Sequence, residues 1–145
     1  MGHTKKFTIS IIILILGSCG GVGHVQFYNF IPSKTDVKQE LIRVINFNGE
    51  YTAPAHWNHY EDGKDNLEDI FIYFKNGPKE LYRVGFNNYD DQSEYKDKTT
   101  LALVAVFDGH LWHSERDLTR SEESRIEKRF ETEILSKMKF SYTLE

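Results

Sequence analysis

The segment from Thr99 to Phe107, TTLALVAVF, constrains the fold of this chain more than any other stretch. It carries no charge, and its side chains are apolar at both even and odd positions, so both faces of a strand formed here must be covered. A half-solvated strand would instead alternate apolar and polar residues. The segment is therefore predicted to be the central strand of a sheet that is covered on both sides. A chain of 145 residues is long enough for one compact domain built around such a strand.

Two turn signals predict further strands beside the central one. Asn76-Gly77 separates Asp69 to Lys75 (DIFIYFK) from Glu80 to Phe86 (ELYRVGF), and both segments are rich in β-branched and aromatic residues. This pattern is typical of a hairpin. Asp108-Gly109 follows the central segment directly and predicts a second hairpin, whose fourth strand runs from His110 to Leu118.

Helical periodicity brackets the predicted strands. The segment from Lys34 to Phe47 follows a capping pair, Ser33 and Asp36, and the segment from Ser121 to Lys139 begins with acidic residues that favour a helix start. The apolar positions with helical spacing are Val37, Leu41, Val44 and Ile45 in the first segment, and Ile126, Phe130, Ile134 and Met138 in the second. The predicted fold is thus α+β in the order α-β-β-β-β-α, a four-stranded antiparallel sheet of two hairpins with both helices packed on it.

The first nineteen residues differ in character from the rest of the chain. Two lysines precede ten uncharged residues, FTISIIILIL, which end at Leu16. Ten helical residues rise only about 15 Å, half of the roughly 30 Å core of a bilayer, so the segment is too short to span a membrane. A basic start followed by a short apolar run is typical of a secretory signal peptide. The small residues Gly17 and Ser18 then precede Cys19, the only cysteine.

This order of basic, apolar and small residues before Cys19 resembles the lipobox of bacterial membrane lipoprotein precursors. The resemblance implies cleavage between Ser18 and Cys19, acylation of the Cys19 thiol and attachment to a membrane of the bacterial cell envelope. Gly20, in place of an Asp after the cysteine, favours the outer membrane if the cell is Gram-negative. The resemblance covers residues 1–19 and implies nothing about the fold or activity of the remaining residues, for which we identify no family.

We therefore divide the chain into a cleaved signal peptide (1–18), a lipidated cysteine with a flexible tether (19–32) and a single globular domain (33–145). An acylated Cys19 leaves no thiol for a disulfide, so the apolar core alone must stabilise the domain. Removal of the signal peptide takes two lysines away and changes the formal net charge from −4 to −6. No basic stripe follows, which argues against a nucleic-acid partner.

Two histidine pairs are candidates for metal binding. His56 and His59 lie in the loop before the first predicted strand, and His110 and His113 lie in the fourth. If the loop and the second hairpin met, four imidazoles could bind zinc or copper. Side chains alternate along a strand, however, so His110 and His113 should point to opposite faces. We therefore expect no metal or other cofactor.

Aromatic and acidic residues outside the predicted core are candidates for contact with a partner protein. These residues are Trp57, Tyr60, Tyr89, Asp90, Asp91 and Trp112. Tyr and Trp are frequent anchors of protein interfaces, and acidic neighbours steer a basic partner towards them.

The sequence carries no GxSxG, Walker or HExxH motif that would indicate an enzyme class. The leading interpretation is a lipid-anchored, non-enzymatic protein-binding module of the envelope. It would act either as an immunity protein against an envelope-targeted toxin or as an accessory subunit of an envelope complex. A small hydrolase or metal-binding protein built on the four histidines is the second interpretation, and a membrane-proximal structural spacer is the third.

Overall fold

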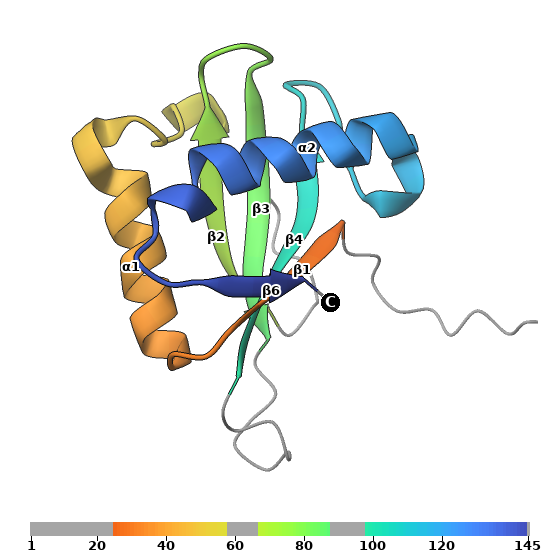
Figure 1. Cartoon of the computed structure of the whole chain (residues 1–145). Helices are drawn as coiled ribbons and strands as arrows, with labels where there is room; N and C mark the ends of the chain where they lie inside the picture. Colours follow the sequence, from red (N-terminus) through yellow and green to blue (C-terminus); the bar gives the residue numbers. More distant parts are fainter. Residues whose placement is uncertain (1–24, 58–66, 88–97, 145) are drawn as a thin grey trace, which may run out of the picture.

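The computed structural model describes residues 25–57, 67–87 and 98–144 (Figure 1). Its helices and strands are β1 (Gln26–Phe30), α1 (Lys34–Asn46), β2 (Leu67–Phe74), β3 (Glu80–Asn87), β4 (Thr99–Phe107), β5 (Trp112–His113), α2 (Arg120–Glu133) and β6 (Tyr142–Leu144). Short 3-10 helices occur at η1 (Phe47–Gly49), η2 (Ala55–Trp57), η3 (Glu115–Asp117) and η4 (Leu135–Lys137). The fold is α+β, with two helices and one antiparallel sheet.

The sheet has the strand order β2-β3-β4-β1-β6, and β5 also pairs with β4. β4 is central, as predicted, because it pairs with β3 on one edge and with β1 and β5 on the other. Both faces of β4 are buried: Leu101 and Leu103 lie in the main core, whereas Ala102 and Val104 lie in a second cluster on the opposite face. The hairpin predicted at Asn76-Gly77 is confirmed, and Gly77 has the positive φ of +75° that this turn requires.

The prediction of a four-stranded sheet in the order α-β-β-β-β-α is wrong, because β1 and β6 add a strand before the first helix and another after the second. β1 lies within residues 19–32, which we had assigned to the tether. It joins the sheet because Tyr28 and Phe30 bury their rings in the main core. β6 contains three residues and pairs only with β1. Strands this short leave almost no periodic signal in the sequence.

The predicted fourth strand, His110 to Leu118, is also wrong in its extent, because β5 contains only two residues. Ser114 and Asp117 form a capping box, with the Ser114 N–H donating to the Asp117 carboxylate at 2.8 Å. This local exchange starts η3 and takes the chain out of the sheet. His110 lies in the turn before β5 and not in the strand.

Both predicted helices are present, and their capping residues explain where they start. Ser33 caps α1 by accepting the Asp36 N–H at 3.3 Å. Thr119 and Glu122 form a capping box at the start of α2. α2 ends at Glu133, earlier than the predicted Lys139. The apolar stripe nevertheless continues through η4, so that all the apolar positions predicted for the two helices are buried.

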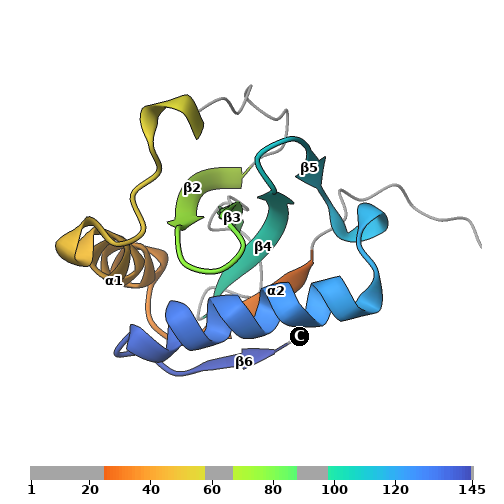
Figure 2. The ribbon, with the colours of Figure 1, turned by 90° about the horizontal axis from the view of Figure 1, so that it is seen from above.

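The main core lies between the sheet and the two helices. α2 crosses β2, β3 and β4 on one face of the sheet, and α1 lies beside it at the β2 edge (Figures 1 and 2). Fully buried aromatic rings fill this layer, including Tyr28 of β1, Tyr82 of β3 and Phe130 of α2. We call this side of the sheet the helix face and the opposite side the back face.

Candidate functional site on the back face of the sheet

Strand register determines which side chains lie on the back face. Residues that are paired across neighbouring strands share a face, and the pairing places aromatic residues around small ones. The back-face residues used below are Phe27 of β1, Asp69 and Phe71 of β2, Arg83 of β3, Ala102 and Phe107 of β4, and Trp112 of β5. Neither α1 nor α2 packs on this face.

Trp112 is the centre of an aromatic cluster on the back face. Its ring lies 5.3 Å from the Phe107 ring and 6.2 Å from the Phe71 ring, measured between centroids. Trp112 also packs on the second apolar cluster, which contains Ala102. All three aromatic rings are partly exposed. The back face therefore presents contiguous aromatic surface that is held in place by its neighbours.

An ion pair crosses the same face. The Arg83 guanidinium lies 2.8 Å from the Asp69 carboxylate, and the two side chains are only 4% and 16% exposed. Few carboxylates and guanidiniums are this deeply placed unless they are paired. Asp69 and Arg83 thus give the back face a fixed polar element beside Phe71, which is the residue paired with Arg83 in the adjacent strand.

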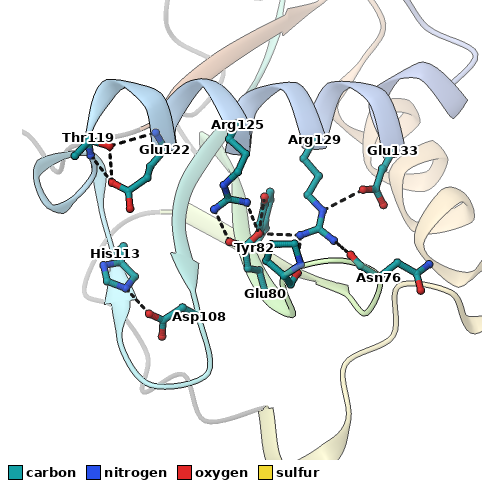
Figure 3. Close-up of polar contacts among 11 residues, drawn as sticks. Asn76, Glu80, Tyr82, Asp108, His113, Thr119, Glu122, Arg125, Arg129 and Glu133 are labelled. Atoms are coloured by element: carbon teal, nitrogen blue, oxygen red, sulfur yellow. Dashed lines mark hydrogen bonds and ion pairs between the residues drawn. The ribbon is translucent and has the colours of Figure 1, made fainter.

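The turn that positions Trp112 is stabilised by Asp108. One oxygen of its carboxylate accepts the N–H groups of His110 and Leu111 at 2.7 and 2.9 Å, and the other lies 2.9 Å from Nε2 of His113 (Figure 3). These bonds, led by the one from Leu111, lower the pKa of Asp108 to about 2. The carboxylate remains charged at neutral pH, and the turn displays Leu111, which is 67% exposed.

The structure separates the predicted site residues into three groups. His56 is exposed on η2, and Trp57 ends that turn. His110, Trp112 and His113 lie in or beside β5. Seven residues lie outside the described part of the chain: Ser18, Cys19, His59, Tyr60, Tyr89, Asp90 and Asp91. Within residues 25–57, 67–87 and 98–144, no three His, Cys, Asp or Glu side chains form a group that could hold a metal ion.

A buried ionic cluster joins α2 to the β2–β3 hairpin. The Glu80 side chain, 6% exposed, accepts hydrogen bonds from Arg125 at 2.6 and 3.0 Å and from Arg129 at 2.9 Å (Figure 3). Arg129 also donates to the carbonyl groups of Pro78, at 2.7 Å, and Asn76. The side chain of Arg129 is only 9% exposed, so this part of the charged side of α2 is buried against the hairpin.

The sequence made Trp112 a candidate contact residue, but the back-face residues that surround it were not among the candidates. Phe71 and Asp69 alternate with core residues along β2, so the strand pattern already placed them on one face. The predicted hairpin already contained both Asp69 and Arg83, but the pattern does not record their ion pair. Nor does it record the contact of Phe71 with Trp112, because Trp112 lies on β5, beyond β3 and β4.

Neither α1 nor α2, the helices of the described residues, is long and apolar enough to cross a membrane. Comparison of the chain with protein-family models, with curated proteins and with solved structures finds no match.

Proposed function

We propose that this chain is a lipid-anchored, non-enzymatic protein-binding module of a bacterial envelope, and that its partner docks on the back face around Trp112. The observation that carries the proposal is the cluster of Trp112, Phe71 and Phe107, three partly exposed rings beside a buried ion pair. Interface hot spots are enriched in Trp and Arg and lie in preorganised, desolvated surroundings.

The anchor in this proposal derives from the order of residues before Cys19. Basic, apolar and small residues precede the only cysteine of the chain, as in lipoprotein precursors. One acyl chain gives marginal membrane binding, whereas the two or more chains of this class give stable attachment. A protein held in this way meets its partners in or beside the same membrane.

One observation bears on the enzymatic alternative. The contact between His113 and Asp108 resembles the base and the orienting carboxylate of a catalytic triad. The neighbouring hydroxyl group, that of Ser114, donates to Asp117 at 2.8 Å and serves the capping box. A nucleophile for this pair would have to come from a different segment, so we rank the enzyme below the binding module.

The test is a crosslinked pull-down of the acylated protein from its native envelope, read by mass spectrometry. We expect one stoichiometric partner whose recovery falls about 30-fold with Trp112→Ala, because truncation of a hot-spot Trp costs about 2 kcal/mol or more of binding free energy. Phe47→Ala is the matched control, since Phe47 is a 61% exposed aromatic residue on η1, away from the back face.

Each outcome separates the interpretations. Loss of the partner with Trp112→Ala but not with Phe47→Ala supports the back face as the docking site. Equal recovery from both variants, at unchanged melting temperature, refutes it. A protein that reaches the membrane and captures no partner would support the structural spacer.

A further inference from the structure

The structure shows where the chain that follows Cys19 joins the fold. The Val25 N–H donates to the Leu103 carbonyl group of β4 at 2.8 Å, and β1 begins at the next residue. Only five residues lie between Cys19 and Val25, so six Cα–Cα steps join them. The inference drawn from this length rests on the lipid anchor proposed above.

This connection is short compared with the size of the domain. Fully extended, its six Cα–Cα steps reach about 20 Å. A compact unit of roughly 120 residues has a radius of gyration near 14 Å and therefore a diameter of about 35 Å. Because the reach is shorter than the diameter, the domain cannot rest on the bilayer with the end opposite Val25 while Cys19 is anchored there.

The sheet register identifies the elements around this point. β1 and β5 pair with the same edge of β4, with Gln26 opposite Leu103 and His113 opposite Val106. The chain leaves β5 into η3 and then α2, so these elements start where β1 starts. Figures 1 and 2 agree that the beginning of β1 and the first turn of α2 lie at one end of the molecule, and that η4 and α1 lie at the other.

Electrostatic attraction to the membrane does not explain an orientation with this end towards the bilayer, so the short connection to Cys19 must impose it. Glu115, Asp117 and Glu122 outnumber Arg116 and Arg120 in η3 and the start of α2. The local excess is acidic, which gives no attraction to anionic lipid. The orientation should therefore be insensitive to salt.

We propose that the start of α2, together with η3 and the beginning of β1, is the surface apposed to the bilayer, and that α2 extends away from the membrane towards η4. The partner of this surface is the lipid bilayer. In this orientation α1 lies on the side of the domain away from the membrane, with the exposed side chain of Phe47 at its C-terminal end.

Two serines allow a matched test of the orientation. Ser121 lies in the first turn of α2 and Ser136 lies in η4, and both are exposed. Glu133 lies twelve residues after Ser121 in α2, about 18 Å along the helix at 1.5 Å each, and Ser136 follows in η4. Ser121→Cys and Ser136→Cys each introduce one thiol with little change in volume, and the thiol of Cys19 is blocked if it is acylated.

The experiment uses the acylated protein in phosphatidylcholine vesicles that contain phosphatidylcholine with a nitroxide headgroup. Each introduced thiol carries a small fluorophore, and collisional quenching by the headgroup nitroxide is measured at low and high salt. We expect the label at Ser121→Cys to be quenched at least about twofold more than the label at Ser136→Cys, because only the former lies within reach of the headgroups.

The unsubstituted protein tests the anchor separately. If it takes up no thiol label when denatured and sediments with vesicles, Cys19 is blocked and the proposed anchor stands. Equal quenching at the two positions, or stronger quenching at Ser136→Cys, would then overturn the orientation alone. Uptake of label at Cys19 in the unsubstituted protein would overturn both the anchor and the orientation.

Discussion

Glu80→Gln tests the role of the ionic cluster between α2 and the β2–β3 hairpin. Glu80 is buried and accepts hydrogen bonds from Arg125, Arg129 and the Tyr82 hydroxyl group, which lies 3.1 Å away. Burial is the main cause of the raised pKa of Tyr82, so this hydroxyl group remains a donor. A glutamine has the same shape as Glu80 but no charge. Its NH₂ group is a donor, and it would replace a carboxylate oxygen that accepts hydrogen bonds from these side chains.

The expected loss in the free energy of unfolding follows from the two arginines. Hydrogen bonds to charged groups contribute about 1.5–3 kcal/mol each. Arg125 is 43% exposed, so water can hydrate its guanidinium when the bond to Glu80 is lost. Its contribution therefore lies at or below about 1.5 kcal/mol, the lower end of this range. The side chain of Arg129 is 9% exposed and would keep its ion pair with Glu133 at 3.0 Å, so its charge would be only partly compensated. We expect a total near 3 kcal/mol, the lower end of the range for breaking a buried ion pair.

Urea unfolding, followed by circular dichroism and tryptophan fluorescence, measures this loss. With a slope of about 1.5 kcal/mol per molar urea, the midpoint should fall by about 2 M at unchanged slope. Glu115→Gln removes an exposed carboxylate of η3 and should change stability by less than about 0.5 kcal/mol. If Glu80→Gln matched this control, the cluster would contribute nothing to stability and the reasoning above would be refuted.

Two further predictions concern acid stability and the start of α2. The Arg43 guanidinium is the main cause of the lowering of the Glu40 pKa from 4.5 to about 2, and hydrogen bonds lower the pKa of Asp108 to about 2. Between about pH 2 and pH 4.5 the unfolded chain binds more protons than the folded chain, because the pKa values of these carboxyl groups are lower in the fold. The two carboxylates therefore stabilise the fold above about pH 4.5, and this stabilisation is lost as the pH falls towards 2. Melting temperatures measured against pH should show this fall, with a shallower slope for Glu40→Gln; an equal slope in both proteins would contradict it. Thr119→Ala should cost about 1 kcal/mol in urea unfolding through loss of the capping box with Glu122, whereas Thr119→Ser should be near neutral. Equal stability of the two Thr119 variants would show that the cap does not contribute.

The candidate site was only partly predictable from the sequence. Trp112 could be named as a candidate contact residue by its type. Its neighbours could not, because the contact with Phe71 depends on the pairing of β2, β3, β4 and β5 in register. The misassigned strand from His110 to Leu118 shows the same limit, since the side chain of Asp117 ends the strand after two residues.

Local sequence by itself determined the helices, the first hairpin and the central strand. Each depends on a signal within a few consecutive residues, such as the cap at Ser33, the turn at Asn76-Gly77 or the apolar run that ends at Phe107. Only the tertiary structure decided the number of strands, the back face and the cluster around Glu80. β1 and β6 become strands because Tyr28 is paired with Leu101 and Leu144, residues far away in the chain. Hydrogen bonds between distant segments satisfy their backbones, and no local pattern records such bonds.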